Sequence, residues 1–277
     1  MMIGRHYQET HTHLLQKALD KFEKRLPRKI NSIKKEDDGE LLGSSISQTV
    51  NVFCESIVAE KDHLTILRFL TFAKELGAAN FASVMRMEET FDVHLLGETI
   101  TLTGAHKACH VDTDVWLKSF YCAQILRDSA AIDVLNEVDE TVFFAAEIKP
   151  DALDLRIVDL MQGIYKGHKE LTTLLNSALQ AEPEDSRLSY AFHLLNPLLS
   201  IIRTIFTPGA DAEFNKEVRE AVELHKKYWG QEDEKWAARG WVSLPLIAMA
   251  ALAYDHKGYE LDFETDYIPD WLVKKQF

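Results

Sequence analysis

Apolar residues recur with the period of an α-helix along most of this chain of 277 residues. The clearest stripe lies in the last third of the chain and has six members: Phe214, Val218, Ala221, Val222, His225 and Trp229. Spacings of three and four residues place such side chains on one face of a helix, and that face needs a partner to exclude water. The pattern therefore predicts an all-α fold, a single-domain array or bundle of antiparallel helix pairs over residues 1–277.

One stretch departs from the helical period, and several residues mark expected helix ends. Residues 98–103 alternate and are β-branched, so they predict at most a short strand or extended segment. Pro27 is expected to close the first helix, because proline interrupts the backbone hydrogen bonds of a helix. The polar residues 28–45 then predict a mobile loop. Asp62 is a candidate helix cap, and Gly77 a candidate helix stop.

The cellular compartment is inferred from apolar runs and cysteines. The longest apolar run, Trp241–Tyr254, is shorter than the roughly 20 residues that span a bilayer, and it predicts a buried helix. The three cysteines (Cys54, Cys109 and Cys122) form no CxxC pair and are too few for a secreted disulfide scaffold. We expect a cytoplasmic protein with reduced thiols and no membrane contact.

The charge of the chain favours a basic partner over nucleic acid. Asp and Glu number 44 against 31 Lys and Arg, which gives a formal charge of −13. Phosphate binding needs clustered basic residues, so direct nucleic-acid binding is not expected. The densest acidic window, residues 133–154, also contains Phe143 and Phe144, and Glu232, Asp233 and Glu234 form a second run. Exposed aromatics among acids would suit a basic protein, whereas buried ones would belong to the core.

From these two runs we select seven candidate partner-binding residues: Asp133, Glu137, Asp139, Glu140, Glu232, Asp233 and Glu234. The segment Lys17–Lys35 has the opposite charge, with eight basic residues against two acids. Because it shares a helix with an apolar stripe, we interpret these charges as a solvated face. The oligomeric state is left open.

No catalytic signature is found, and one metal-ligand pattern is weak. Phosphate-loop, nucleophile-elbow, zinc-helix and dinucleotide-binding motifs are missing from the sequence. On a helix, His106 and His110 would share a face with Cys109 beside them, which could hold a cation. The alternative is a junction between a loop and a helix capped by Asp112, and we favour it because no second ligand cluster is found. We expect no catalytic residue, metal or cofactor, and we interpret His225 as a hydrogen-bonded core histidine.

The C-terminal quarter has a distinctive pattern of aromatic and proline residues. A helix ends in an aromatic pair, a Trp and a Pro open an Ala/Leu-rich helix closed by an Asp, and a Tyr-x-Pro tail follows. The residues of this pattern are Tyr228, Trp229, Trp241, Pro245, Asp255, Tyr267 and Pro269. Over roughly residues 211–271 it resembles the Imm49 family of immunity proteins from bacterial polymorphic-toxin systems. These residues are mostly of packing type, so we assign them to the fold.

The resemblance implies an all-helical, non-catalytic protein that binds and neutralises a toxin delivered between competing cells. Toxins paired with such proteins are often nucleases, and an acidic inhibitor would suit a surface that holds phosphates. Two other hypotheses remain open. The chain could be a helical scaffold or adaptor for a host protein, or a metal-dependent hydrolase that uses His106, Cys109 and His110.

Overall fold

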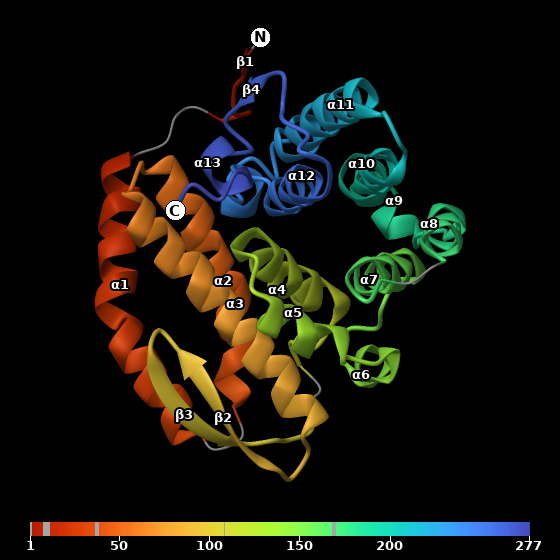
Figure 1. Cartoon of the computed structure of the whole chain (residues 1–277). Coiled ribbons are helices and arrows are strands. Elements are labelled where there is room, and N and C mark those ends of the chain that lie inside the picture. The colour runs from red at the N-terminus through yellow and green to blue at the C-terminus, as the bar shows by residue number, and fades with distance from the viewer. Residues whose placement is uncertain (1, 8–11, 37–38, 108, 168–169) are drawn as a thin grey trace. The chain divides into compact units, whose positions relative to one another are not determined.

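The structure is a computed structural model that describes residues 2–7, 12–36, 39–107, 109–167 and 170–277 (Figure 1). It is 67% helical, so the predicted all-α class is confirmed. The chain divides into two compact units. We call Thr10–Pro150 the N-terminal unit, and Asp151–Phe277 together with Met1–Glu9 the C-terminal unit. Whether the two act as a single domain stays a prediction.

The N-terminal unit contains helices and one β-hairpin. Its elements are α1 (Thr12–Lys35), α2 (Glu40–Val58), α3 (His63–Met85), β2 (Thr90–Leu95), β3 (Glu98–Thr103), α4 (Thr113–Leu126), α5 (Ser129–Asn136) and α6 (Glu140–Ala145). Helix α2 packs against α1 and α3, and α3 packs against α4 and α5. The helices bury Phe53, Phe69 and Trp116 completely. The hydrophobic effect at these side chains holds the unit together.

The predicted extended segment is one strand of a hairpin. Strand β3 (Glu98–Thr103) pairs antiparallel with β2 (Thr90–Leu95) over six residues each. Gly97, in the turn between them, has a φ of +86°, which a residue without Cβ adopts without steric cost. Ile100 and Leu102 face the core and are fully buried. The alternation of apolar and polar residues therefore indicates which face of the strand is buried.

The first helix and the segment after it differ from the sequence prediction. Helix α1 continues through Pro27 to Lys35, and α2 begins at Glu40, so the predicted mobile loop over residues 28–45 is wrong. Residues 37 and 38 lie outside the described part. Proline inside a helix costs about 3 kcal/mol, but Ile30 and Ile33 continue the buried stripe beyond it. Their burial at about 1.5–3 kcal/mol each offsets that cost.

Two of the predicted helix boundaries lie at α3. Asp62 caps this helix as predicted, because its Oδ1 accepts the Thr65 backbone N–H at 3.0 Å. The predicted stop at Gly77 is wrong, since α3 runs on to Met85. A Cβ at Gly77 would lie 2.2 Å from the Ser119 hydroxyl of α4. This glycine therefore serves the close approach of two helices instead of ending one.

The C-terminal unit is built around helices α10, α11 and α12. Its helices and strands are β1 (Met2–Ile3), α7 (Ala152–Tyr165), α8 (Leu171–Gln180), η1 (Asp185–Arg187), α9 (Leu188–Tyr190), η2 (Ala191–Leu195), α10 (Asn196–Phe206), α11 (Asp211–Trp229), η3 (Ala238–Gly240), α12 (Leu244–Lys257), β4 (Glu264–Thr265) and α13 (Asp270–Val273). Strands β1 and β4 pair in parallel, which joins the two ends of the chain.

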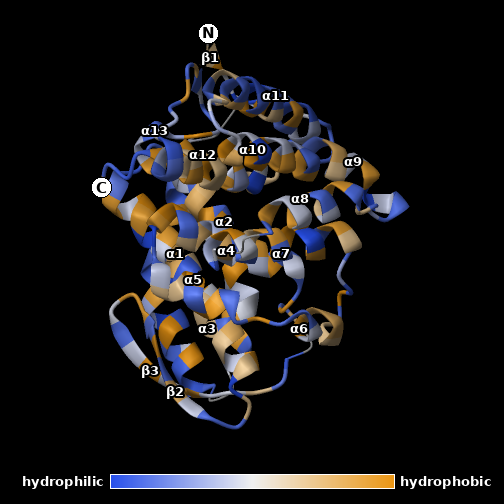
Figure 2. Cartoon of the chain, turned by 45° about the vertical axis from the view of Figure 1, so that its right-hand side comes forward, coloured by the Kyte–Doolittle hydropathy of each residue, from blue (hydrophilic) through white to orange (hydrophobic). Residues whose placement is uncertain are grey.

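Helix α12 is the most buried helix of this unit, as its apolar run predicts. Residues 246–253 are all buried, and Figure 2 shows the hydrophobic character of this helix. Pro245 stands in its first turn, where a missing N–H leaves no hydrogen bond unmade. Gly258 ends it in the left-handed conformation, with a φ of +68°. Within the described ranges, no helix combines the length and apolar character that a bilayer crossing requires.

Candidate functional site

Four of the candidate partner-binding acids lie close together in the N-terminal unit. Asp133 and Glu137 extend from α5 and its end, and Asp139 and Glu140 begin α6. All four are exposed, and Glu147, just after α6, is exposed as well. The only basic residue between positions 133 and 149 is Lys149. We call these five carboxylates the acidic patch.

Two apolar side chains project from the acidic patch. Phe143 is buried against Phe81, at a ring-centroid distance of 6.4 Å, and belongs to the core. Phe144, in contrast, is 52% exposed, and Ile148 is 67% exposed. Of the two alternatives that the sequence left open, burial in the core therefore holds for Phe143 and exposure among acids for Phe144. The patch combines carboxylates, which attract a basic surface, with apolar groups that gain by leaving water.

Asp139 has a structural role besides its charge. Its Oδ1 accepts the backbone N–H of Thr141 at 2.9 Å, which satisfies the first turn of α6. This hydrogen bond to the charged form holds the pKa of Asp139 below its ordinary value. A substitution at Asp139 would therefore disturb α6 as well as the charge of the patch.

The last two acidic residues of the window 133–154 do not lie on the surface. Asp151 and Asp154 belong to the C-terminal unit, and both carboxylates are buried. Asp151 caps α7, and Arg187 donates to Asp154 Oδ2 at 2.5 Å and lies 3.5 Å from Asp151 Oδ2. This arginine, 33 residues away from Asp154, neutralises charges that the sequence alone groups with the acidic run.

The second acidic run lies in the C-terminal unit between α11 and η3. Glu232 and Asp233 are exposed, whereas Glu234 is half-buried. Glu232 pairs with Lys235 at 2.8 Å, which reduces the local negative charge. Trp236, next in the chain, is 57% exposed. This run is thus smaller and more nearly neutralised than the acidic patch.

The segment with the candidate metal ligands is a loop, so the helical arrangement on which the metal hypothesis depended is wrong. His106, Cys109 and His110 lie between β3 and α4, and His110 has a φ of +58°. Among the described residues, no group of three His, Cys, Asp or Glu side chains is arranged to hold an ion. Cys109 donates instead to Glu147 Oε2 at 2.9 Å. Asp112 caps α4 through the Val115 N–H, as the favoured alternative predicted.

Lys107, in the same loop, was missed by the sequence reasoning. It is 4% exposed, and its Nζ donates to the carbonyl of Gly39 at 2.7 Å and to Asn80 Oδ1 at 3.2 Å. Asn80 in turn donates to the carbonyl of His110 at 2.9 Å. A buried lysine needs such acceptors, and here they connect the loop to the start of α2 and to α3. The loop therefore has a structural role.

The aromatic residues of the C-terminal pattern surround a tight contact between α11 and η3. A Cβ at Gly240 would lie 2.5 Å from the Trp229 ring, so only glycine fits there without a shift. Trp241 donates from Nε1 to the carbonyl of Lys235 at 3.0 Å. Tyr228 stacks edge-on against Trp229 at 5.1 Å. Of the other pattern residues, Pro269 precedes α13, while Asp255 lies exposed in the last turn of α12.

His225 and Tyr267 form the polar centre of this region. His225 is buried, its Nε2 lies 3.0 Å from the carbonyl of Gly240, and burial lowers its pKa to about 3. Its ring meets Tyr267 edge-on at 4.9 Å. Tyr267 Oη accepts the backbone N–H of His6 at 2.6 Å and lies 3.0 Å from His6 Nδ1. His225 is thus neutral at pH 7, and its ring satisfies a carbonyl group in the core.

The residues after the first strand reinforce the same region. Arg5 donates from Nε to the carbonyl of Trp241 at 2.9 Å and from Nη2 to the carbonyl of Asp266 at 3.1 Å. Its backbone N–H donates to the Asp266 carboxylate at 3.1 Å. These contacts span 236 to 261 residues of sequence, so no local pattern announces them. They join the first residues of the chain to the C-terminal motif.

Comparison with known proteins identifies the family. The sequence model of Immunity protein 49 (Imm49) matches residues 58–272, which include the acidic patch, the second acidic run and the C-terminal aromatic pattern. The chain belongs to the Imm49 family. Nothing among curated proteins or solved structures matches the chain. Family membership supports a role in immunity, and α1 with nearly all of α2 precedes the matched residues.

Proposed function

We propose that this Imm49 protein protects the cell that makes it by binding a toxin in the cytoplasm and neutralising it through protein–protein contact, without catalysis. Membership in a family of immunity proteins carries this proposal. The acidic patch with Phe144 and Ile148 is the contact surface that we assign to it. Exposed apolar groups inside a charged rim are the usual anatomy of a protein-binding surface.

The chemistry of the acidic patch favours a basic toxin surface. Five exposed carboxylates with one lysine nearby produce a negative potential that steers a basic partner toward the patch. A nuclease must hold phosphates and therefore presents basic residues around its active site. We therefore propose a nuclease as the toxin. The second acidic run at residues 232–234 is the competing contact surface.

A growth assay tests the neutralisation itself. Cells express the toxin domain encoded beside this gene, with or without this protein, and both proteins are then purified through a tag on the toxin. We expect growth only when the immunity protein is present, together with recovery of both proteins in one complex. Failure of the protein to restore growth against a toxin that kills the host would overturn the proposal.

A pair of charge reversals locates the contact surface. Asp133→Lys with Glu137→Lys changes the acidic patch and leaves the Asp139 cap intact. Glu98→Lys with Glu220→Lys is the matched control, because both residues are exposed, lie outside the acidic runs and give the same change in net charge. At low salt we expect the patch variant to slow association with the toxin about tenfold and the control to leave it within twofold.

A third double variant, Glu232→Lys with Asp233→Lys, tests the competing surface. If this variant slows association while the patch variant does not, the contact lies at residues 232–234 and our assignment is wrong. Phe144→Ala and Ile148→Ala test the apolar anchors. An anchor in a desolvated contact costs more than 1 kcal/mol of binding on truncation, so each should accelerate dissociation about fivefold or more.

A further inference from the structure

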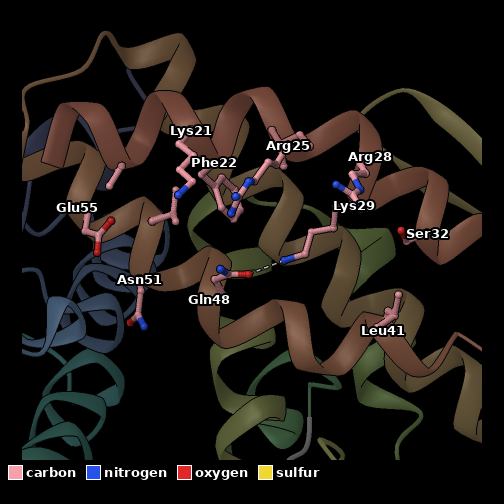
Figure 3. A pocket seen from close by; sticks show the side chains of 13 residues that line it. Lys21, Phe22, Arg25, Arg28, Lys29, Ser32, Leu41, Gln48, Asn51 and Glu55 are labelled. Atoms are coloured by element: carbon pink, nitrogen blue, oxygen red, sulfur yellow. Dashed lines mark hydrogen bonds between the residues drawn. The ribbon is translucent and has the colours of Figure 1, made fainter. Parts of the chain in front are cut away.

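A basic groove lies between α1 and α2, outside the residues that match the family. Its volume is about 670 Å³, and Figure 3 shows the side chains that line it. The lining residues of α1 run from Ala18 to Ser32, and those of α2 from Leu41 to Glu55. At 1.5 Å per residue each wall is about 21 Å long. All of them precede residue 58, where the family match begins.

The groove has the opposite charge to the chain as a whole. Lys21, Arg25, Arg28 and Lys29 line it from α1, and Glu55 is the single carboxylate among the lining residues. Its net charge of +3 contrasts with −13 for the whole protein. The four cations are spaced i, i+4, i+7 and i+8, so they follow one side of the helix over about 12 Å.

The acids of α1 are engaged elsewhere. Asp20 pairs with Lys61 at 2.9 Å, and Glu23 pairs with Arg68 of α3 at 2.9 Å. Within the part of the chain that the structure describes, no carboxylate lies within 4 Å of the Lys21, Arg25 or Arg28 cations. The charges that we interpreted from the sequence as a solvated face therefore divide into an ion-paired side and a side with excess positive charge.

The floor of the groove is apolar and partly buried. Phe22, Leu26, Leu41 and Val52 line it, and Leu26 and Val52 are buried. Burial lowers the pKa of Lys29 and raises the pKa of Glu55, because the walls of the groove shield both charged groups from water. Lys29 Nζ donates to Gln48 Oε1 at 2.7 Å across the groove (Figure 3). Polar amides thus flank an apolar floor beneath a row of cations.

From this arrangement we propose that the groove binds an acidic amphipathic helix of a partner protein. The apolar face of such a helix would cover Phe22 and Leu41, and carboxylates at matching spacings would meet Arg25 and Arg28. A groove of 21 Å accommodates about 14 helical residues. Single-stranded nucleic acid fits less well, because it requires a series of aromatic stacking platforms and the floor offers one ring, Phe22.

This site is distinct from the acidic patch in place and in chemistry. It takes an acidic ligand where the acidic patch takes a basic one, so the two surfaces can serve two partners or two regions of one partner. Neither the family match nor toxin binding at the acidic patch is needed for the inference.

The probe is a fluorescein-labelled 16-residue peptide with Leu on one helical face and Glu at i, i+4, i+7 and i+8 on the adjacent side. Anisotropy is measured with the full chain at low and high salt. We expect saturable binding that weakens as salt rises. Arg25→Glu with Arg28→Glu should weaken it about tenfold, and Glu55→Gln should strengthen it about twofold to threefold.

The matched control is Lys24→Glu with Lys34→Glu, which makes the same charge change on exposed residues of α1 that do not line the groove. It should retain binding within twofold, and circular dichroism should show equal helix content in all variants. Equal loss of binding in the control and the groove variant would overturn the proposal. So would absence of peptide binding to the wild type, or preferential binding of a labelled single-stranded oligonucleotide of equal charge.

Discussion

Acidification should destabilise the C-terminal unit through His225. The imidazole is fully enclosed in the core, and burial lowers its pKa from 6.5 to about 3. The unfolded chain therefore takes up the proton first as the pH falls. The stabilisation is fully present above pH 6.5 and is lost progressively as the pH falls from 6.5 toward 3.

The size of the effect follows from proton linkage. With pKa values of 6.5 unfolded and about 3 folded, this one group removes about 2 kcal/mol of unfolding free energy between pH 7 and pH 5. Any folded pKa below about 4 gives nearly the same loss at pH 5, because the folded imidazole is then still neutral. A loss of this size is a large fraction of the 5–15 kcal/mol that stabilises a typical protein.

The matched variant is His225→Gln, whose side-chain amide can still donate to the Gly240 carbonyl but does not titrate. Urea unfolding is followed by tryptophan fluorescence at pH 7 and pH 5, since four of the five tryptophans lie in the C-terminal unit. His6 is present in both proteins, so its own titration cancels in the comparison. We expect the wild type to lose about 2 kcal/mol more than His225→Gln. Equal losses in both proteins would refute a neutral, buried His225.

Three further predictions concern packing, reactivity and a buried ion pair. Gly240→Ala should destabilise the protein by about 2 kcal/mol, because the new Cβ meets the Trp229 ring at 2.5 Å; an unchanged urea midpoint would contradict this. Glu147→Gln should speed alkylation of the Cys109 thiol at pH 8, since the Glu147 hydrogen bond and charge raise the Cys109 pKa; equal rates would show that the contact does not control the thiol. Arg187→Met should lower the free energy of unfolding by about 2 kcal/mol, because it leaves the buried carboxylates of Asp151 and Asp154 without their cation. Unfolding followed by calorimetry measures this, and an unchanged stability would contradict the prediction.

The acidic patch could be located from sequence, but its anchors could not. Local acid density identified Asp133 to Glu140 because Asp and Glu side chains without a cationic partner are almost always exposed. Which of Phe143 and Phe144 is buried depends on Phe81, more than 60 residues earlier, which packs against Phe143. The excess positive charge of Lys17–Lys35 is visible in the sequence, but the groove was missed because its second wall, from Leu41 to Glu55, comes from another helix.

Elements that depend on neighbouring residues can be predicted without the structure. The helical period fixed the all-α class, Asp62, Asp112 and Asp151 capped the helices that follow them, and Pro245 and Gly258 bounded α12. Each of these effects acts within one helical turn, so nearby residues are sufficient to predict it.

Other features depend on residues that are far apart in the chain and meet in the folded protein. Helix α1 continues through Pro27 because Ile30 and Ile33 are buried, and α3 continues through Gly77 because Ser119 approaches it. Arg5 reaches residues at the other end of the chain. Burial and ion pairing depend on which segments meet in space, and a one-dimensional pattern does not contain that information.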